Sequence, residues 1–346
     1  MNRIKIGIVG YGDRGQHLME KLRRSSHYVV TAVCDIDIRK LKNIPSEITE
    51  YSLPDKVFAD EDVDVVFIAA NNSAHKELAV RAAEAGKDII CATPAALSLD
   101  DLNEMLAAVD ECGVNFTVYH RHRLDKGFQI MQNVRDSDKL GQIYLIKSSM
   151  NMAVGYLQDW HRFASEGGGV LMDLGVTMLD QMMCLMPGAK VTGVYADLRS
   201  VVNKEVDDYC RIILQFEGGI SAEIELGTLL LSDKEDKWFE HHWYAAGTKG
   251  CVYVDGNEEI EGKLVLASEW LTDRKRTVSD HSSVRERMYT EELPEAGESE
   301  YFFENYWKAY DGQEEFQVTT AEILRVQKIV EAVRMSAATN TVVKPN

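Results

Sequence analysis

The chain has 346 residues, of which 45% are hydrophobic, and this length suggests two domains that can each bury a core. Its formal net charge of −18 argues against nucleic acid or an anionic membrane surface as a partner, and no apolar run approaches the roughly 20 residues of a membrane span. The six cysteines show neither a C-x-x-C pair nor a metal-ligand spacing, so we expect reduced thiols and no metal site.

The first 35 residues predict a strand, a glycine-rich turn, a helix and a second strand. The apolar runs at 4–9 and 28–33 are typical of inner parallel strands, and 14–22 has a helical pattern. The turn between them has G-x-G-x-x-G spacing, in which the glycines permit a tight turn, the approach of a diphosphate and close helix packing. This predicts a dinucleotide site. The predicted cofactor loop is Gly10, Tyr11, Gly12, Asp13, Arg14 and Gly15.

Asp35 follows the second strand, twenty residues beyond the third glycine. Its carboxylate can accept hydrogen bonds from both hydroxyls of an adenosine ribose, and it would repel a 2′-phosphate by roughly 4 kcal/mol at contact distance. Arg39 and Lys40 lie close by and partly offset this repulsion. We therefore expect NAD in preference to NADP. The alternative is that Asp35 is a solvated acid at a strand end.

Strands and helices continue to alternate up to His120. Strands are expected at 63–69, 88–91 and 114–118, and helices at 74–85 and 98–112. This alternation predicts a doubly wound parallel sheet, whose ligands bind beyond the carboxyl ends of its strands. The segments 10–15, 70–75 and 92–95 should therefore face one crevice. They add Ala70, Asn71, Asn72, His75 and Pro94 to the expected cofactor residues.

After His120 the pattern changes to longer alternating segments joined by turn signals. We expect an α/β class protein with two domains, 1–120 and 121–346, the second built on a large, mostly antiparallel open sheet. Its predicted strands are 143–152, 191–198, 209–216, 220–226, 244–246 and 251–254, and its helices are 170–186 and 320–337. The charged segments 232–242, which includes His241 and His242, and 273–305 are expected to be solvated loops.

Five motifs along nearly the whole chain resemble those of the Gfo/Idh/MocA family, nicotinamide-dependent oxidoreductases of which many act on sugars, inositols and polyols. They are GYGDRG at 10–15, ANNSAH at 70–75, AGK at 85–87, the GGG stretch with Asp173, Gly175 and Asp180, and AGTKG at 246–250. The resemblance implies an N-terminal Rossmann domain. It also implies that the second domain's sheet forms a homodimer or homotetramer interface.

Two departures from the family concern its proton chemistry. Thr93 stands where the E-K-P motif supplies a lysine, and Thr177 stands where the D-x-x-x-H motif supplies a histidine, whereas Asp173 is retained. A positioned acid or base contributes about 3–5 kcal/mol to lowering a barrier, and positioning of the reactants about 7–11 kcal/mol. The loss therefore makes the usual mechanism doubtful without proving inactivity.

Nearby residues offer replacements for the two missing groups. Asp173, Thr177 and Asp180 should share one face of the helix at 170–186, directed at the crevice. His120 or His122 can titrate near neutrality and take over proton transfer. The predicted catalytic residues are Asp173, His120, Thr93 and Thr177. The predicted substrate residues are Arg123, Tyr156, Trp160, His161 and Asp180.

Three functions are compatible with this sequence. The favoured one is an NAD-dependent oxidoreductase that acts on a hydroxyl or carbonyl carbon of a small, sugar-like or polyol substrate. The second is a catalytically silent NAD-binding sensor or partner subunit, because Thr93 and Thr177 replace the usual groups. The third is a lyase or glycoside-cleaving enzyme that retains NAD. The start MNRIKIGIVG leads directly into a strand, so we expect no signal peptide and a cytoplasmic protein.

Overall fold

The computed structural model describes residues 3–345 except 230–238, 257–258, 268–287 and 297–300. Contacts group these residues into two compact units. The first contains the chain up to His120, Phe163–Gly168 and Tyr301–Lys328, and the second contains the remaining described residues. The chain therefore passes between the units several times, whereas the sequence pattern predicted one division after residue 120.

The first unit is built on a parallel sheet, which among the described residues has six strands in the order β3-β2-β1-β4-β5-β6. This confirms the predicted doubly wound sheet. Because β1, β4 and β5 are neighbours, the segments that follow them share one edge of the sheet, as expected. The strands are β1 (Ile4–Val9), β2 (Tyr28–Cys34), β3 (Thr49–Tyr51), β4 (Val65–Ile68), β5 (Asp88–Ala92) and β6 (Phe116–Tyr119).

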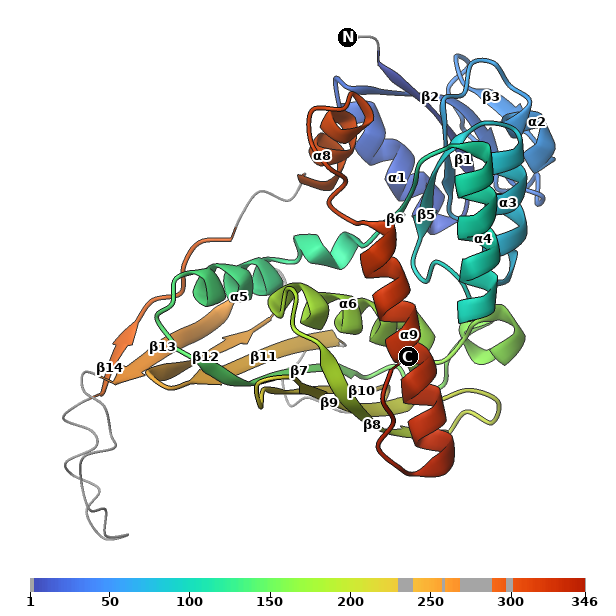
Figure 1. Ribbon diagram of the computed structural model, residues 1–346. Helices are drawn as coiled ribbons and strands as arrows, with labels where there is room; N and C mark the ends of the chain where they lie inside the picture. Colours follow the sequence, from blue (N-terminus) through green and yellow to red (C-terminus); the bar gives the residue numbers. More distant parts are fainter. Residues whose placement is uncertain (1–2, 230–238, 257–258, 268–287, 297–300, 346) are drawn as a thin grey trace, which may run out of the picture. The chain divides into compact units, whose positions relative to one another are not determined.

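Helices cover both faces of this sheet, with α3 and α4 side by side on one face and α1 on the other (Figure 1). Local signals set their ends: the Ser98 hydroxyl accepts a hydrogen bond from the Asp101 amide at the start of α4, and left-handed Gly113 ends it. The helices of this unit are α1 (Asp13–Arg24), α2 (Pro54–Phe58), α3 (His75–Glu84), α4 (Leu99–Cys112) and α8 (Tyr301–Tyr310).

Helix α8 completes the first unit, although it lies far along the chain from the rest of that unit. The Tyr28 hydroxyl donates a hydrogen bond of 2.6 Å to the carbonyl of Phe303. The rings of Tyr119 and Phe302 lie 4.9 Å apart, and His27 stacks on Trp307 at 3.9 Å. The sequence pattern did not predict this helix.

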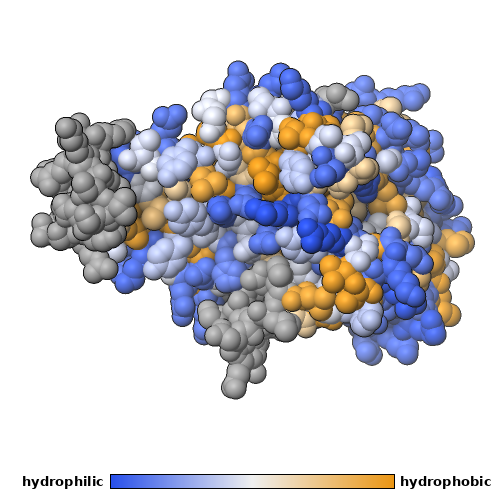
Figure 2. All heavy atoms as spheres, turned by 90° about the horizontal axis from the view of Figure 1, so that it is seen from below, coloured by the Kyte–Doolittle hydropathy of each residue, from blue (hydrophilic) through white to orange (hydrophobic). Residues whose placement is uncertain are grey.

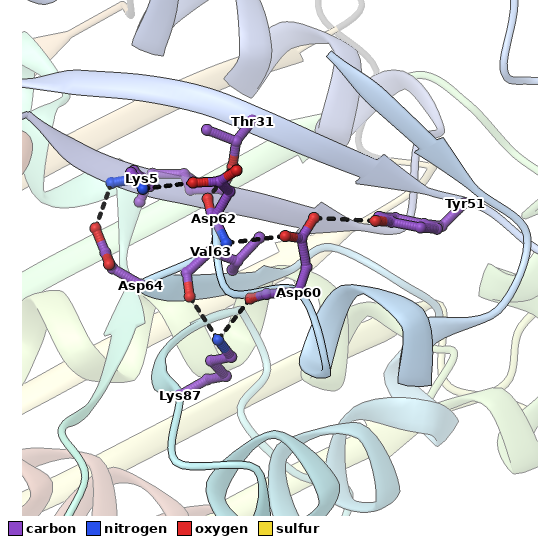
Figure 3. A network of polar contacts seen from close by, with 9 residues as sticks. Lys5, Thr31, Tyr51, Asp60, Asp62, Val63, Asp64 and Lys87 are labelled. Carbon is purple, nitrogen blue, oxygen red and sulfur yellow. Dashed lines mark hydrogen bonds and ion pairs between the residues drawn. The ribbon is translucent and has the colours of Figure 1, made fainter.

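A polar network closes the edge of the sheet at which β4 and β5 begin (Figure 3). The Lys87 ammonium donates to the carbonyls of Asp60 and Val63, both at 2.7 Å, and Lys5 pairs with Asp62 at 2.6 Å. These contacts hold the turn before β4. Lys87 therefore has a structural role at the edge opposite to the glycine loop.

The second unit is built on a sheet with the strand order β14-β13-β12-β11-β7-β10-β9-β8, in which the described neighbours are antiparallel except for β7 and β10. Helices α5 (Lys126–Asp136) and α6 (Val176–Leu185) cover one of its faces (Figure 1). The strands are β7 (Ile143–Met152), β8 (Val191–Arg199), β9 (Tyr209–Phe216), β10 (Ser221–Gly227), β11 (Phe239–Gly247), β12 (Gly250–Asp255), β13 (Glu261–Ala267) and β14 (Met288–Glu291). This confirms the predicted, mostly antiparallel sheet.

The predicted helix 170–186 is in fact two pieces. A π-helical turn, Leu171–Gly175, precedes α6, and the amide of Val176 donates to the carbonyl of Leu171. A π turn adds a residue to the local helical repeat, so the helix that the pattern predicted is not uniformly α-helical. Thr177 and Asp180 are buried while Asp173 is partly exposed, and their shared face toward a substrate stays a prediction.

The expected charged loops also contain regular structure. His241 and His242 lie in β11, where His241 is buried against Ser148 and His242 bonds Asp255 at 2.8 Å, so the prediction of a solvated loop there was wrong. The segment 273–305 contributes β14 and the start of α8. The other parts of both loops lie outside the described residues or carry no regular element. The last helix, α9, spans Thr320–Thr339.

Candidate cofactor site and acid–histidine pair

The three loop glycines have different surroundings. Gly10 has a φ of +98°, and a Cβ on it would lie 2.4 Å from the amide nitrogen of Ala70. A Cβ on Gly15 would lie 2.1 Å from the Gly10 carbonyl oxygen. On Gly12 it would meet open space, with the Lys40 ammonium at 3.9 Å as its nearest neighbour. Two glycines are therefore required by the fold, and the third leaves room for a ligand.

The start of α1 presents backbone amides beside this open space. Gly12 is the N-cap and supplies no side chain for the first turn, in which amides lack intrahelical acceptors. These groups and the helix dipole fit a diphosphate. The Arg14 guanidinium donates to the Thr93 carbonyl at 2.9 Å. The Tyr11 ring is buried, and its hydroxyl lies 3.3 Å from the sulfur of Met19.

Asp35 lies beside the glycine loop and is only 6% exposed. One carboxylate oxygen accepts the Tyr11 amide at 2.8 Å, and the other accepts the Asp37 amide at 2.9 Å. The Lys40 ammonium lies 3.5 Å from the carboxylate. This burial excludes the alternative of a solvated strand-end acid. Its neighbour Ile36 is 81% exposed, so an apolar side chain faces solvent beside the buried acid.

The loops after β4 and β5 are tied together by His75. Its ring nitrogens lie 2.8 Å from the Pro94 carbonyl and 3.1 Å from the Ala70 carbonyl. The side chain is fully buried, and burial lowers the pKa of His75 although both carbonyls oppose this effect. His75 was expected to line the crevice. In the structure it fixes the loops that border the site, and the peptide between Thr93 and Pro94 is cis.

Asn72 is also buried, and its side chain bonds to the backbone of another segment. Its side-chain amide donates to the Gly167 carbonyl at 3.3 Å, and the neighbouring Ser73 hydroxyl donates to Glu166 at 2.5 Å. The short helix Asn72–Ala74 thereby fastens the segment Phe163–Gly168 within the first unit. Asn71 itself is exposed, and direct contact of Ala70, Asn71 or Pro94 with a cofactor stays a prediction.

In the second unit the structure brings together two residues that the sequence pattern placed in different roles. His161 Nε2 lies 3.7 Å from a carboxylate oxygen of Asp173, and both side chains are partly exposed. The ring of His161 stacks on Trp160 with 3.7 Å between the centroids. The amide of Gly169 donates to the His161 carbonyl at 2.9 Å, which joins the two segments. The other ring nitrogen, Nδ1, lies 3.2 Å from the Gln158 carbonyl, so the imidazole is held between this carbonyl and the carboxylate.

Asp207 holds the backbone shortly before Asp173, a role that the sequence motifs did not predict. Its carboxylate accepts the Leu171 amide at 2.8 Å, and its carbonyl accepts the Val170 amide at 3.0 Å. A Cβ on Gly169, whose φ is +92°, would lie 2.4 Å from this carboxylate. Burial raises the pKa of Asp207. Nothing in the local sequence distinguishes it from other acids, because its partners lie 36 residues away.

The other predicted site residues are mostly buried. Arg123 and Asp180 form a buried ion pair with two bonds of 2.7 and 2.6 Å, so each satisfies the other's charge. Thr177 and His120 are also buried, whereas Tyr156 is 66% exposed. A direct role of these residues toward a substrate stays a prediction. The described residues contain no group of side chains suited to a metal ion and no helix that could span a membrane.

Three features define a dinucleotide-binding Rossmann protein: the parallel sheet, the glycine loop with open space beside Gly12, and the buried Asp35. Residues 4–120 match the oxidoreductase family with an NAD-binding Rossmann fold, and residues 128–253 match the GFO/IDH/MocA C-terminal domain. The chain belongs to the Gfo/Idh/MocA family and is an NAD-binding oxidoreductase by fold and family.

Several relatives show how broad this family is. The chain is 28% identical to the uncharacterized oxidoreductase YrbE of Bacillus subtilis (79% of this chain, 80% of the relative) and 23% identical to myo-inositol 2-dehydrogenase of Thermotoga maritima (77% and 79%). It is 27% identical to 2,7-anhydro-N-acetylneuraminate hydratase of Escherichia coli (77% and 71%). The crystal structure of an NAD-binding protein from Listeria innocua is similar, with a TM-score of 0.87 at 29% identity, covering 99% of this chain and 97% of that one.

Proposed function

We propose that this protein is an NAD(H)-dependent enzyme that oxidises or reduces a hydroxyl or carbonyl carbon of a small polyol or sugar derivative. The bound nicotinamide supplies the hydride chemistry. The glycine loop and Asp35 hold the dinucleotide through backbone amides, a helix dipole and the ribose acid. The observation that carries the proposal is the pairing of His161 with Asp173 in a chain that lacks the family's usual lysine and histidine.

His161 and Asp173 divide the proton chemistry between them in this proposal. The imidazole accepts the proton of a substrate hydroxyl, and the carboxylate lies beside the ring as its acidic partner. Trp160, stacked on His161, supplies an apolar face of the kind that packs against the C–H face of a sugar ring. Thr93 and Thr177 need no acid–base role under this scheme.

A second candidate function is a lyase or hydratase reaction with retained NAD. The similarity to a 2,7-anhydro-N-acetylneuraminate hydratase favours it. A hydratase reaction causes no net oxidation of its substrate. The two candidates are separated by stoichiometry. An oxidoreductase forms one reduced nicotinamide for each substrate oxidised, or consumes one for each substrate reduced, whereas a hydratase forms product with no net change in the nicotinamide. A silent NAD-binding sensor or partner subunit forms no product at all.

The test replaces the pair one residue at a time. Asp173→Asn and His161→Gln should each lower kcat by about 10²–10⁴-fold, on a substrate found in a panel of inositols, sugars and sugar acids, while the affinity for NAD is unchanged. Asp159→Asn is the matched control, because Asp159 is an exposed acid two residues from His161. Full turnover in both variants would contradict the assignment of the pair.

The location, the oligomeric state and the partners of the enzyme follow from the same reading. We expect a cytoplasmic homodimer or homotetramer that acts on a small molecule and binds neither nucleic acid nor membranes. The net charge of −18 supports the last two points.

A further inference from the structure

The segment Phe163–Gly168 groups with the first unit, although the residues before and after it belong to the second. Two hydrogen bonds attach it to the loop after β4. The Ser73 hydroxyl donates to the Glu166 carboxylate at 2.5 Å, and the Asn72 side chain donates to the Gly167 carbonyl at 3.3 Å. The first of these is charge-assisted and belongs to the stronger class of hydrogen bonds.

Close packing adds to these two bonds. Gly167 has a φ of +70°, and a Cβ on it would lie 2.4 Å from Leu97 Cδ2 and 3.2 Å from Asn72 Cβ. Leu97 follows β5 and Asn72 follows β4, and the ring of His75 bonds to carbonyls of both loops. The segment therefore rests on the two loops that border the predicted dinucleotide site.

Backbone hydrogen bonds connect the same segment to the acid–histidine pair. Within it, the Gly168 amide donates to the Phe163 carbonyl at 3.0 Å and closes a compact turn. Directly outside it, the Gly169 amide donates to the His161 carbonyl at 2.9 Å, and the Asp173 amide donates to the Gly169 carbonyl at 3.1 Å. A displacement of the turn would therefore reach both members of the pair along the chain.

We propose that Phe163–Gly168 is a strap through which an occupied dinucleotide site fixes the spacing of His161 and Asp173. The hydrogen bond between Ser73 and Glu166 is the latch of this strap. Both latch residues are positioning residues, since neither needs to touch the substrate or the reacting atoms. A dinucleotide bound to the loop after β4 restricts the motion of that loop, and the latch passes the restriction to the strap. The inference rests on the proposed function in taking His161 and Asp173 as the proton-transferring pair.

Hydrogen exchange of the full chain, followed by mass spectrometry with and without saturating NAD, tests the strap without any turnover. In wild-type protein, NAD should slow the exchange of the backbone amides in 159–173 by about fivefold or more. In Ser73→Ala this slowing should fall below about twofold, while the slowing in the glycine loop at 10–15 persists. Ser165→Ala is the matched control and should behave as wild type, because Ser165 is an exposed serine of the strap itself.

Two further measurements separate positioning from a merely structural role. Ser73→Thr keeps the hydroxyl and should restore the slowing by NAD. On a substrate found in the panel, Ser73→Ala and Glu166→Ala should each lower kcat by about fivefold to tenfold with KM unchanged, the effect of losing one hydrogen bond to a charged group. Thermal melting confirms that each variant is folded, and the exposed position of Ser73 makes its replacement mild.

Other outcomes decide against the strap. Equal slowing of 159–173 by NAD in wild type and in Ser73→Ala would show that the latch carries no restriction, and the inference would be overturned. Glu166→Ala that retains the slowing would overturn it as well. Wild-type protein that binds NAD with no slowing in 159–173 overturns the inference and leaves the proposed function intact. Protein that does not bind NAD would remove the proposed function and this inference together.

Discussion

Three glycines of one loop respond differently to the same added methyl group. Gly12 has an ordinary φ of −76° and open space where a Cβ would lie, whereas the Cβ of Gly15 would collide with the backbone of Gly10. Gly12→Ala should therefore leave the melting temperature within about 2 °C of wild type and weaken NAD binding at least about tenfold, because the methyl occupies the diphosphate side.

Gly15→Ala is the contrasting variant in the same assay. It should lower stability by about 1–3 kcal/mol in chemical unfolding, because strain or a backbone shift must relieve the contact at 2.1 Å. Equal loss of stability in both variants would show that the space beside Gly12 is required by the fold and not by a ligand.

Residues of the site differ in how far the sequence alone reveals them. Gly10, Gly15 and Asp35 are predictable because their tasks are fixed by spacing within one strand–turn–helix unit. The contact between His161 and Asp173 depends on the path of an irregular loop that turns back through Gly169. Asp207 joins the same place from a distant loop. No local sequence pattern encodes such a contact, so the sequence predicted His161 only as a substrate residue.

Strands β7 and β11 enclose a buried histidine, His241. His241 is buried, its Nε2 lies 2.8 Å from the Ser148 hydroxyl, and its ring lies 4.8 Å from that of Trp243. Burial, with smaller contributions from His122 and His242, lowers the pKa of His241 to about 3.

The stability of this element should fall as the pH falls. The unfolded chain protonates His241 near its ordinary pKa of 6.5, but the folded chain resists protonation down to about pH 3. The stabilising effect is complete above pH 6.5 and is lost progressively below it, by about 2 kcal/mol between pH 6.5 and 5. Urea unfolding at several pH values should show this slope. His241→Gln should reduce it, and His17→Gln, at an exposed histidine, should not.

Part of the slope should survive in His241→Gln, because burial lowers the pKa of His75 in the same direction. A slope unchanged by His241→Gln would show that this histidine has the same protonation in the folded and the unfolded chain, and would contradict the lowered pKa.

Helices and strands with a strong hydrophobic periodicity were predictable from the sequence, and the others were not. The bounds of β7 and β9 coincide with the alternating segments 143–152 and 209–216. Helices α5 and α8 were missed, and the π turn before α6 was read as ordinary helix. A π turn leaves the apolar pattern almost intact while it rotates every side chain beyond it. Periodicity therefore reports that a segment is helical but does not fix which residues share a face.

At the scale of the molecule, the second sheet has one face that no described helix covers. Paired residues across neighbouring strands form a row on this face, in which Glu223 lies beside Lys147, Lys147 beside Tyr244, and Tyr244 beside Tyr253. Figure 2 views the molecule from below, away from α5 and α6, and shows hydrophobic and hydrophilic residues interspersed. Exposed tyrosines such as Tyr244 and Tyr253 are enriched in protein interfaces.

We expect this face to join two copies of the chain. Light scattering after gel filtration should give a multiple of the chain mass of 39.0 kDa. The double variant Tyr244→Glu, Tyr253→Glu should shift the protein to the monomer, because it adds like charges on both sides of a symmetric contact. Tyr156→Glu is the control, since Tyr156 is exposed but lies outside the sheet. A monomeric wild type, or a double variant of unchanged mass, would contradict the assignment.

The position of α8 in the chain affects how the protein is made. Tyr28 and Tyr119 are synthesised within the first 120 residues, but the helix that covers them is not completed until residue 310. During translation, the aromatic face of the nucleotide-binding sheet therefore stays uncovered while the whole second sheet is synthesised. Nascent chains of this protein should depend on chaperones during that interval, and the dinucleotide can stabilise the sheet fully only after translation is nearly finished.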